Sequence, residues 1–123
     1  MSEYLGQAND EIAIIVQIES AAAVNAIDDI LKVESVDAVF VGPYDLSSSM
    51  GKPGQVADAE VQSAIARVKQ AALESDKSLG IFSASAEVAK GYMREGCNLI
   101  AVGVDTLMLA NAAKGALETL RGD

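Results

Sequence analysis

Two acidic side chains, Glu19 and Asp45, each follow a short apolar segment, and this placement is compatible with a cation site. The apolar segments are Ile12–Ile18 and Val36–Val41. Two carboxylates at neighbouring strand ends repel each other unless a cation lies between them, and oxygen ligands with open positions suit Mg²⁺ or Mn²⁺. Solvated turn or cap residues would explain the same two acids. The spacing alone leaves both interpretations open.

Gln17 lies two residues before Glu19. In an extended strand both side chains then point to the same side. Polar side chains that face a barrel interior near its mouth are costly unless they bind something. Asp105 is better explained as a helix cap, and Cys97 as a small buried residue than as a catalytic group.

The elements that must position these residues follow from the hydrophobic pattern. Strands are expected over 12–18, 36–41, 79–82 and 98–104, and helices from Ser20 to about Val33, from Asp58, from Ser85 and from Asp105 to about Leu120, with one long loop over 47–54. The first strand is nearly continuous in apolar residues, which predicts burial on both faces. The helix from Asp58 buries Val61, Ile65, Val68 and Ala72, and the helix from Ser85 buries Val88, Ala89, Tyr92 and Met93 before a left-handed Gly96.

The order βαβαβαβα predicts an α/β fold with a parallel sheet. No linker interrupts the units, so residues 1–123 form a single domain. Two architectures fit, a small doubly wound sheet and part of a (β/α)₈ barrel, which takes ~250 residues when complete. Neither a G-x-G-x-x-G nor a P-loop motif follows any expected strand, so the usual nucleotide-binding signatures are missing.

Composition excludes several classes of partner and chemistry. The chain has 9 basic and 18 acidic residues and a net charge of −9, which argues against nucleic acid and anionic membrane as partners. A single cysteine and no apolar run of membrane-spanning length predict a cytoplasmic protein. Histidine is absent, which removes the commonest general base. The three arginines, Arg67, Arg94 and Arg121, fall on expected helices and are interpreted as solvated.

Three segments resemble the HpcH/HpaI aldolase family, whose members are metal-dependent (class II) pyruvate aldolases. They are Ile15–Ser20 (IVQIES), Val41–Gly51 (VGPYDLSSSMG) and Ala101–Thr106 (AVGVDT). The resemblance extends from about Tyr4 to Leu120. The citrate lyase β-subunit branch of the superfamily is similar, but Gln17 favours the aldolases.

The resemblance implies a role for each site residue. Glu19 and Asp45 match the two carboxylate ligands of a divalent cation, Mg²⁺, Mn²⁺ or Co²⁺. Gln17 matches a residue near the bound oxo-acid. Tyr44 and Asp45 match positions whose backbone N–H groups receive the carboxylate of pyruvate, and such turn amides next to a helix start bind anions well.

The resemblance also implies that the chain corresponds to strands five to eight of a (β/α)₈ TIM barrel. The family's histidine base, its aspartate partner and an arginine belong to the other half, so no catalytic residue is assigned here. We expect a carbon–carbon lyase that cleaves 4-hydroxy-2-oxo acids to pyruvate and an aldehyde, present as a C-terminal fragment or truncated form. The alternative is a non-catalytic half barrel that binds divalent metal or oxo-acid, or assembles with a partner. Because a half barrel leaves two sheet edges and an apolar wall uncovered, a homo-oligomer is expected.

Overall fold

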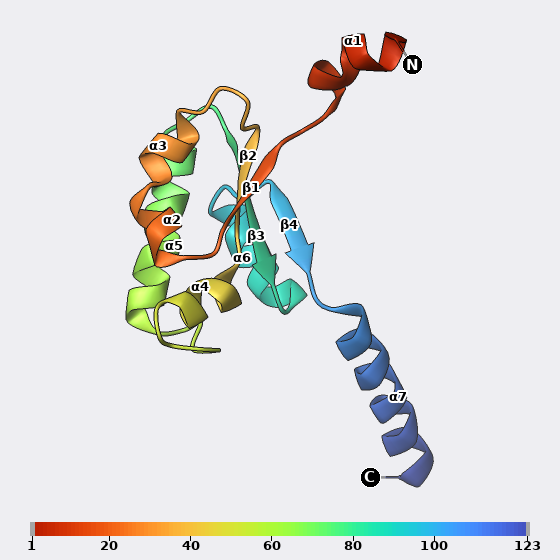
Figure 1. The fold of residues 1–123 in the computed structure, drawn as a ribbon. Helices are drawn as coiled ribbons and strands as arrows, with labels where there is room; N and C mark the ends of the chain where they lie inside the picture. The colour runs from red at the N-terminus through yellow and green to blue at the C-terminus, as the bar shows by residue number, and fades with distance from the viewer. Residues whose placement is uncertain (1, 123) are drawn as a thin grey trace.

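The computed structural model describes the backbone of residues 2–122 and the side chains of residues 6–122. The elements are α1 (Ser2–Glu11), β1 (Ile15–Ile18), α2 (Ala21–Asn25), α3 (Ile27–Leu31), β2 (Ala38–Val41), α4 (Pro43–Ser49), α5 (Ala59–Leu73), β3 (Ser78–Ser83), α6 (Ala86–Arg94), β4 (Leu99–Val102) and α7 (Asp105–Arg121) (Figure 1). The predicted alternation of strands and helices is confirmed.

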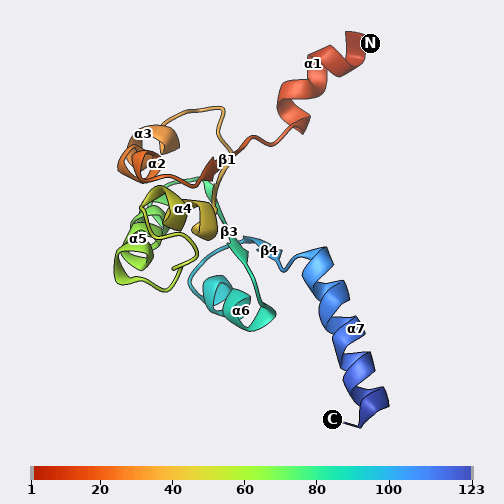
Figure 2. The same cartoon turned by 60° about the horizontal axis from the view of Figure 1, so that its bottom comes forward.

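The four strands form one parallel sheet in the order β1-β2-β3-β4. Gln17 pairs with Phe40, and Phe82 pairs with Ala101, so these side chains share one face of the sheet. Helices α2, α3, α5 and α6 lie on the other face (Figures 1 and 2). This one-sided arrangement is that of a barrel segment, since a doubly wound sheet carries helices on both faces.

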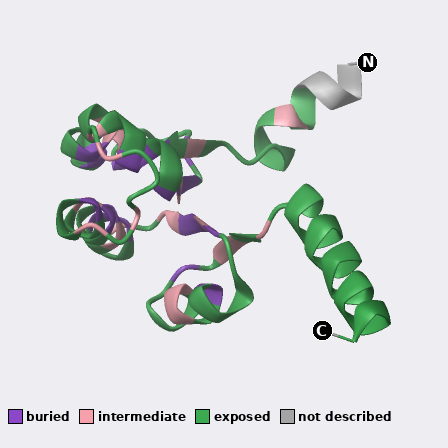
Figure 3. Cartoon of the chain, turned by 90° about the horizontal axis from the view of Figure 1, so that it is seen from below, coloured by how far each residue is buried: buried purple, intermediate pink, exposed green. Residues whose placement is uncertain are grey.

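The core lies between that helical layer and the sheet. The α5 residues Val61, Ile65 and Val68 are at most 2% exposed, and they pack with Ile18 of β1 and Ile81 of β3 in one hydrophobic cluster. Buried positions accordingly gather where helices and strands face each other (Figure 3). The predicted apolar stripe of α5 is confirmed, and it gives the sheet one firmly packed face.

The prediction for the first strand was wrong in extent and in burial. β1 begins at Ile15, and the side chains of Ile12, Ile14 and Ile15 are 53%, 43% and 50% exposed. Ile12 and Ile14 precede the strand, and Ile15 lies on the same face as Gln17, opposite the helical layer. Burial on both faces requires covering surfaces that the described part of the chain does not supply here.

The single helix expected over 20–33 is divided into α2 and α3 at Ala26. The division is confined to one residue, because the N–H of Ala26 donates to Ala22 O and the N–H of Ile30 donates to Ala26 O across it. Val24 and Ile27, on either side of the division, are both buried. The predicted apolar face of this segment therefore reaches the core.

Three smaller expectations also fail. The expected loop over 47–54 begins later, because Pro43 at the first turn of α4 starts a helix that extends to Ser49. Val88 and Met93 of α6 are 54% and 62% exposed rather than buried, since α6 contacts the sheet through a narrower strip around Ala89.

The third concerns Asp105, which is not the N-cap of α7. It is the first residue of that helix, and its Oδ1 accepts a hydrogen bond from the N–H of Thr106 at 2.7 Å, while Val104 takes the cap position. Asp58, in contrast, caps α5 as predicted.

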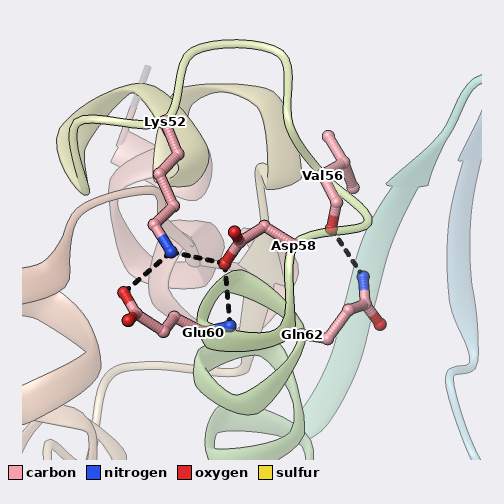
Figure 4. A network of polar contacts seen from close by, with 5 residues as sticks. All are labelled: Lys52, Val56, Asp58, Glu60 and Gln62. Atoms are coloured by element: carbon pink, nitrogen blue, oxygen red, sulfur yellow. Dashed lines mark hydrogen bonds and ion pairs between the residues drawn. The ribbon is translucent and has the colours of Figure 1, made fainter.

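The loop that follows α4 is anchored at Asp58 (Figure 4). Asp58 Oδ1 accepts the N–H of Glu60 at 2.9 Å and lies 2.6 Å from Lys52 Nζ, which also lies 2.9 Å from Glu60 Oε2. Gln62 Nε2 donates to Val56 O at 2.8 Å. The hydrogen bond from Lys52 and then the backbone N–H of Glu60 lower the pKa of Asp58. These contacts join the end of the loop to the start of α5.

Helix α7 departs from the sheet instead of returning over it (Figures 1 and 2). The chain turns at Gly103, whose φ is +72°, and a Cβ there would clash with the side chain of Met108. None of the α7 residues is buried, and Leu109 and Leu120 are 73% and 83% exposed. Over residues 2–122, no helix combines the length and apolar composition that crossing a bilayer requires.

Alanine substitutions at two glycines should change the free energy of unfolding in opposite directions. In Gly80→Ala, the new Cβ would lie 2.5 Å from Phe40 Cδ2 and 3.1 Å from the carbonyl oxygen of Leu99, so we expect a loss of about 1–3 kcal/mol of unfolding free energy. In Gly91→Ala, within α6, nothing lies within 4 Å of the added methyl group, so helix propensity should add about 0.5–1 kcal/mol. Urea unfolding of both variants measures these changes. A neutral Gly80→Ala variant would contradict the close packing of β2 against β3.

Candidate metal and oxo-acid site

A pocket of about 520 Å³ opens at the carboxyl edge of the sheet. It lies on the face opposite the core, because the strand residues in its wall, Gln17, Phe40 and Phe82, share that face. The wall is mostly apolar and is completed by the turns and helix starts that follow the strands: Gly42, Pro43, Tyr44, Asp45, Ala84, Val104 and Leu107.

Gly42 allows the ends of β1 and β2 to approach closely. A Cβ atom at this position would lie 3.1 Å from Gln17 Nε2, 3.3 Å from Glu19 Cβ and 3.5 Å from Glu19 Oε2. The φ of Gly42 is −101°, so the position requires glycine for space and not for backbone conformation. The two polar side chains at the end of β1 therefore lie together against the end of β2, as their spacing in the sequence predicts.

The turn after Gly42 places Tyr44 and Asp45 at the start of α4. Pro43 occupies the first turn of the helix, and the N–H of Leu46 donates to Gly42 O at 2.9 Å. The N–H groups in a first helical turn have no acceptor within the helix, so those of Tyr44 and Asp45 are available to an anion. The Tyr44 ring meets Phe82 edge to face, with the ring centroids 6.0 Å apart.

The two carboxylates occupy different places relative to the pocket. Asp45 lines it, whereas Glu19 touches Gly42 at its border. Residues 6–122 hold no group of three or more histidine, cysteine, aspartate or glutamate side chains that could ligate a metal. A pair of carboxylates nevertheless fits Mg²⁺, which proteins commonly bind through one or two carboxylates with water and substrate oxygens in the remaining positions. The absence of a Cβ at Gly42 leaves room for the Glu19 carboxylate beside the pocket.

The cysteine and the three arginines considered in the sequence analysis lie away from the pocket. Cys97 is 4% exposed, as predicted, and burial raises the pKa of its thiol. Arg67 forms an exposed ion pair with Asp28, and Arg94 and Arg121 are exposed on α6 and α7. The arginines are solvated as expected.

Sequence reasoning missed the part of the site that forms its walls. Phe40 and Phe82 lie in strands but were not assigned to the site, and Leu107 reaches the pocket from α7. The role of Gly42 was missed as well, although a glycine between a strand end and a proline was the available signal.

Comparison with known proteins identifies the class. The family model described as HpcH/HpaI aldolase/citrate lyase matches residues 1–112. The chain belongs to this family, as its motifs predicted.

Individual relatives agree with this assignment. The chain is 46% identical over 112 residues to a 4-hydroxy-2-oxo-heptane-1,7-dioate aldolase of Escherichia coli, a match that covers 91% of this chain and 43% of that protein. It is 44% identical over 119 residues to a hydroxypyruvate/pyruvate aldolase of Delftia acidovorans, covering 97% and 44%. The chain thus spans less than half the length of these curated relatives.

A solved structure extends the similarity to the whole described fold. The chain resembles a HpcH/HpaI aldolase/citrate lyase family protein of Burkholderia cenocepacia with a TM-score of 0.93 and 38% identity, covering 97% of this chain and 46% of that one. Helix α7 makes up 17 residues of the 123. The matched 97% of the chain therefore includes most of α7.

Proposed function

We propose that this chain supplies the cation-binding and oxo-acid-binding half of a metal-dependent aldolase, which cleaves 4-hydroxy-2-oxo acids to pyruvate and an aldehyde. The main support is the convergence at Gly42, where Gln17 and Glu19 meet the turn that carries Asp45 at the mouth of an apolar pocket. The aldolase names of the two relatives favour the same reaction class.

In this proposal each residue has a defined task. Glu19 and Asp45 hold a divalent cation, Mg²⁺, Mn²⁺ or Co²⁺, which supplies Lewis-acid stabilisation of the pyruvate enolate when bound. The N–H groups of Tyr44 and Asp45 receive the substrate carboxylate, and Gln17 lies beside the oxo-acid. Phe40 and Phe82 exclude water from the pocket, which strengthens the electrostatic interactions within it.

The proton-transfer group is not supplied by these residues. The 123 residues contain no histidine, Gln17 does not titrate, and both site carboxylates are assigned to the cation. We therefore assign proton transfer to no residue of this chain. This gap favours a second candidate, a non-catalytic half barrel that binds cation and oxo-acid only.

Cation binding is the first test. Glu19→Gln and Asp45→Asn should each weaken Mn²⁺ binding by at least about 10-fold, because each removes a charged ligand from a two-carboxylate site. Isothermal titration calorimetry measures the affinity, and Glu60→Gln, an exposed carboxylate in the α5 cap, is the matched control. Equal affinity in wild type and Glu19→Gln would remove Glu19 from the site.

Catalysis by the chain alone tests whether it contains a proton-transfer group. General acid–base assistance contributes about 10²–10⁴-fold to rate, so aldol cleavage by the 123-residue chain should be at least about 100-fold slower than by a full-length relative. The measurement is kcat on one 4-hydroxy-2-oxo acid with Mn²⁺ present. Near-equal rates would mean that a residue of this chain moves the proton. Absent pyruvate binding would exclude both candidates.

We also propose that the chain forms a homo-oligomer through α7. A right-handed crossover places the helix after β4 beside α6, over the outer face of β4. Because α7 departs, Val102 on that face remains 40% exposed. Met93 is 62% exposed on α6, roughly opposite Glu95, which contacts Lys69 of α5. We assign the surface that carries these exposed apolar side chains to α7 of a second copy.

The apolar stripe of α7 tests this assembly. Leu109, Leu117 and Leu120 recur at helical spacing on one side of α7 and are 73%, 49% and 83% exposed. The double change Leu109→Glu with Leu117→Glu should convert a dimer or larger assembly to a monomer in light scattering. Asn111→Glu, on the opposite side of α7, should leave the mass unchanged. A folded wild-type monomer at micromolar concentration would contradict the proposal.

A further inference from the structure

Ser49 forms a hydrogen bond between two segments that are far apart in the sequence. Its Oγ accepts the N–H of Ala21 at 3.0 Å, across 28 residues. The same hydroxyl donates to Leu46 O at 2.9 Å, so its hydrogen is directed into its own helix and its lone pairs face outward. The bond thus connects the last residue of α4 with the first residue of α2.

The exposed amide of Ala21 takes Ser49 as its acceptor at the start of α2. First-turn N–H groups of a helix have no partner within the helix. At the start of α2, Ser20 Oγ accepts the N–H of Ala23 at 3.2 Å and so satisfies a different group. Ser49 satisfies the N–H of Ala21 from another element.

The two joined segments are those that carry the proposed cation ligands. Ala21 lies two residues after Glu19, and Ser49 lies four residues after Asp45 on the same short helix. Without this hydrogen bond, α4, which carries Asp45, loses a direct contact with the segment that carries Glu19. The strand pairing that continues through Gly42 N to Ile18 O, at 3.1 Å, fixes only the start of the turn.

We infer that Ser49 is a positioning residue for the cation site: its hydroxyl holds α4 against the start of α2 and thereby sets the separation of Glu19 and Asp45. This inference rests on the proposed function. A positioning role differs from general packing because it depends on a single hydrogen bond between the Ser49 hydroxyl and the Ala21 amide. Each of the two groups can be removed separately.

The neighbouring serines show why position 49 is special. Ser47 and Ser48 both donate to Tyr44 O, at 2.7 Å and 3.0 Å, within α4. Ser48 is exposed, so Ser48→Ala removes a comparable hydroxyl bond from the same helix without touching α2. It is the matched control.

The test combines Mn²⁺ affinity with amide exchange. Ser49→Ala should weaken Mn²⁺ binding about 10-fold, the lower range for groups that orient metal ligands, and should accelerate hydrogen exchange of the Ala21 amide in the metal-free protein. Ser48→Ala should change neither quantity. Ser49→Thr, which retains the hydroxyl, should restore both.

A second variant removes the donor and leaves Ser49 unchanged. Ala21→Pro deletes the N–H at the first position of α2, where proline is well tolerated, and Ser20 already has the extended backbone that precedes proline (φ −139°, ψ 152°). It should lower Mn²⁺ affinity as much as Ser49→Ala does. Combined with Ser49→Ala, it should cause no further loss, because both changes break the same bond.

The possible results distinguish an error in the role of Ser49 from an error in the proposed cation site. If wild type binds Mn²⁺ and Ser49→Ala binds it equally well, or if Ser48→Ala loses as much, the positioning role of Ser49 is wrong. If wild type does not bind Mn²⁺, the cation site is wrong, and exchange of the Ala21 amide still reports whether Ser49 joins the two segments.

Discussion

Parallel pairing of the four strands brings every proposed functional group to one edge of the sheet. In a parallel sheet all strands end on the same side. Here the end of β1 and the turns after β1 and β2 supply the polar groups, while Phe82 of β3 and Leu107 of α7 supply apolar wall. This arrangement depends on the opposite face, where Val61, Ile65 and Val68 of α5 pack against the strands. The packed face holds the register, so the other face is free to form a pocket.

The local parts of the fold and site could be predicted because they depend on nearby residues. The stripe of α5 follows from helical spacing, and the common orientation of Gln17 and Glu19 follows from strand alternation. The failures involve surfaces distant in the sequence. Whether Ile15 or Met93 is buried depends on what lies beside it in space, and both lie at the margins of the sheet–helix layers. Gly42 has its role because Gln17 and Glu19 approach it from another strand, which its own neighbours in the sequence do not indicate.

Charge gives an independent physical reason for a cation at this edge. The chain carries a net charge of −9, and Glu19 and Asp45 stand beside the pocket. An oxo-acid anion would be repelled both by the molecule as a whole and by these carboxylates. Backbone N–H groups at the start of α4 offset only part of this repulsion. The proposed divalent cation between the carboxylates and the substrate would reverse the local sign and so favour binding of the anion.

The pocket and the proposed assembly share an element, which couples them. Leu107 lines the pocket from the first turn of α7, while the rest of that helix is exposed along its length. A helix with no buried residue is held mainly at its attachment, here the Met108 side chain against Gly103. Docking of α7 on a second copy would hold Leu107 in place and complete one pocket wall. The affinity for an oxo-acid should then rise with protein concentration, because the apolar wall would be ordered only in the assembled state.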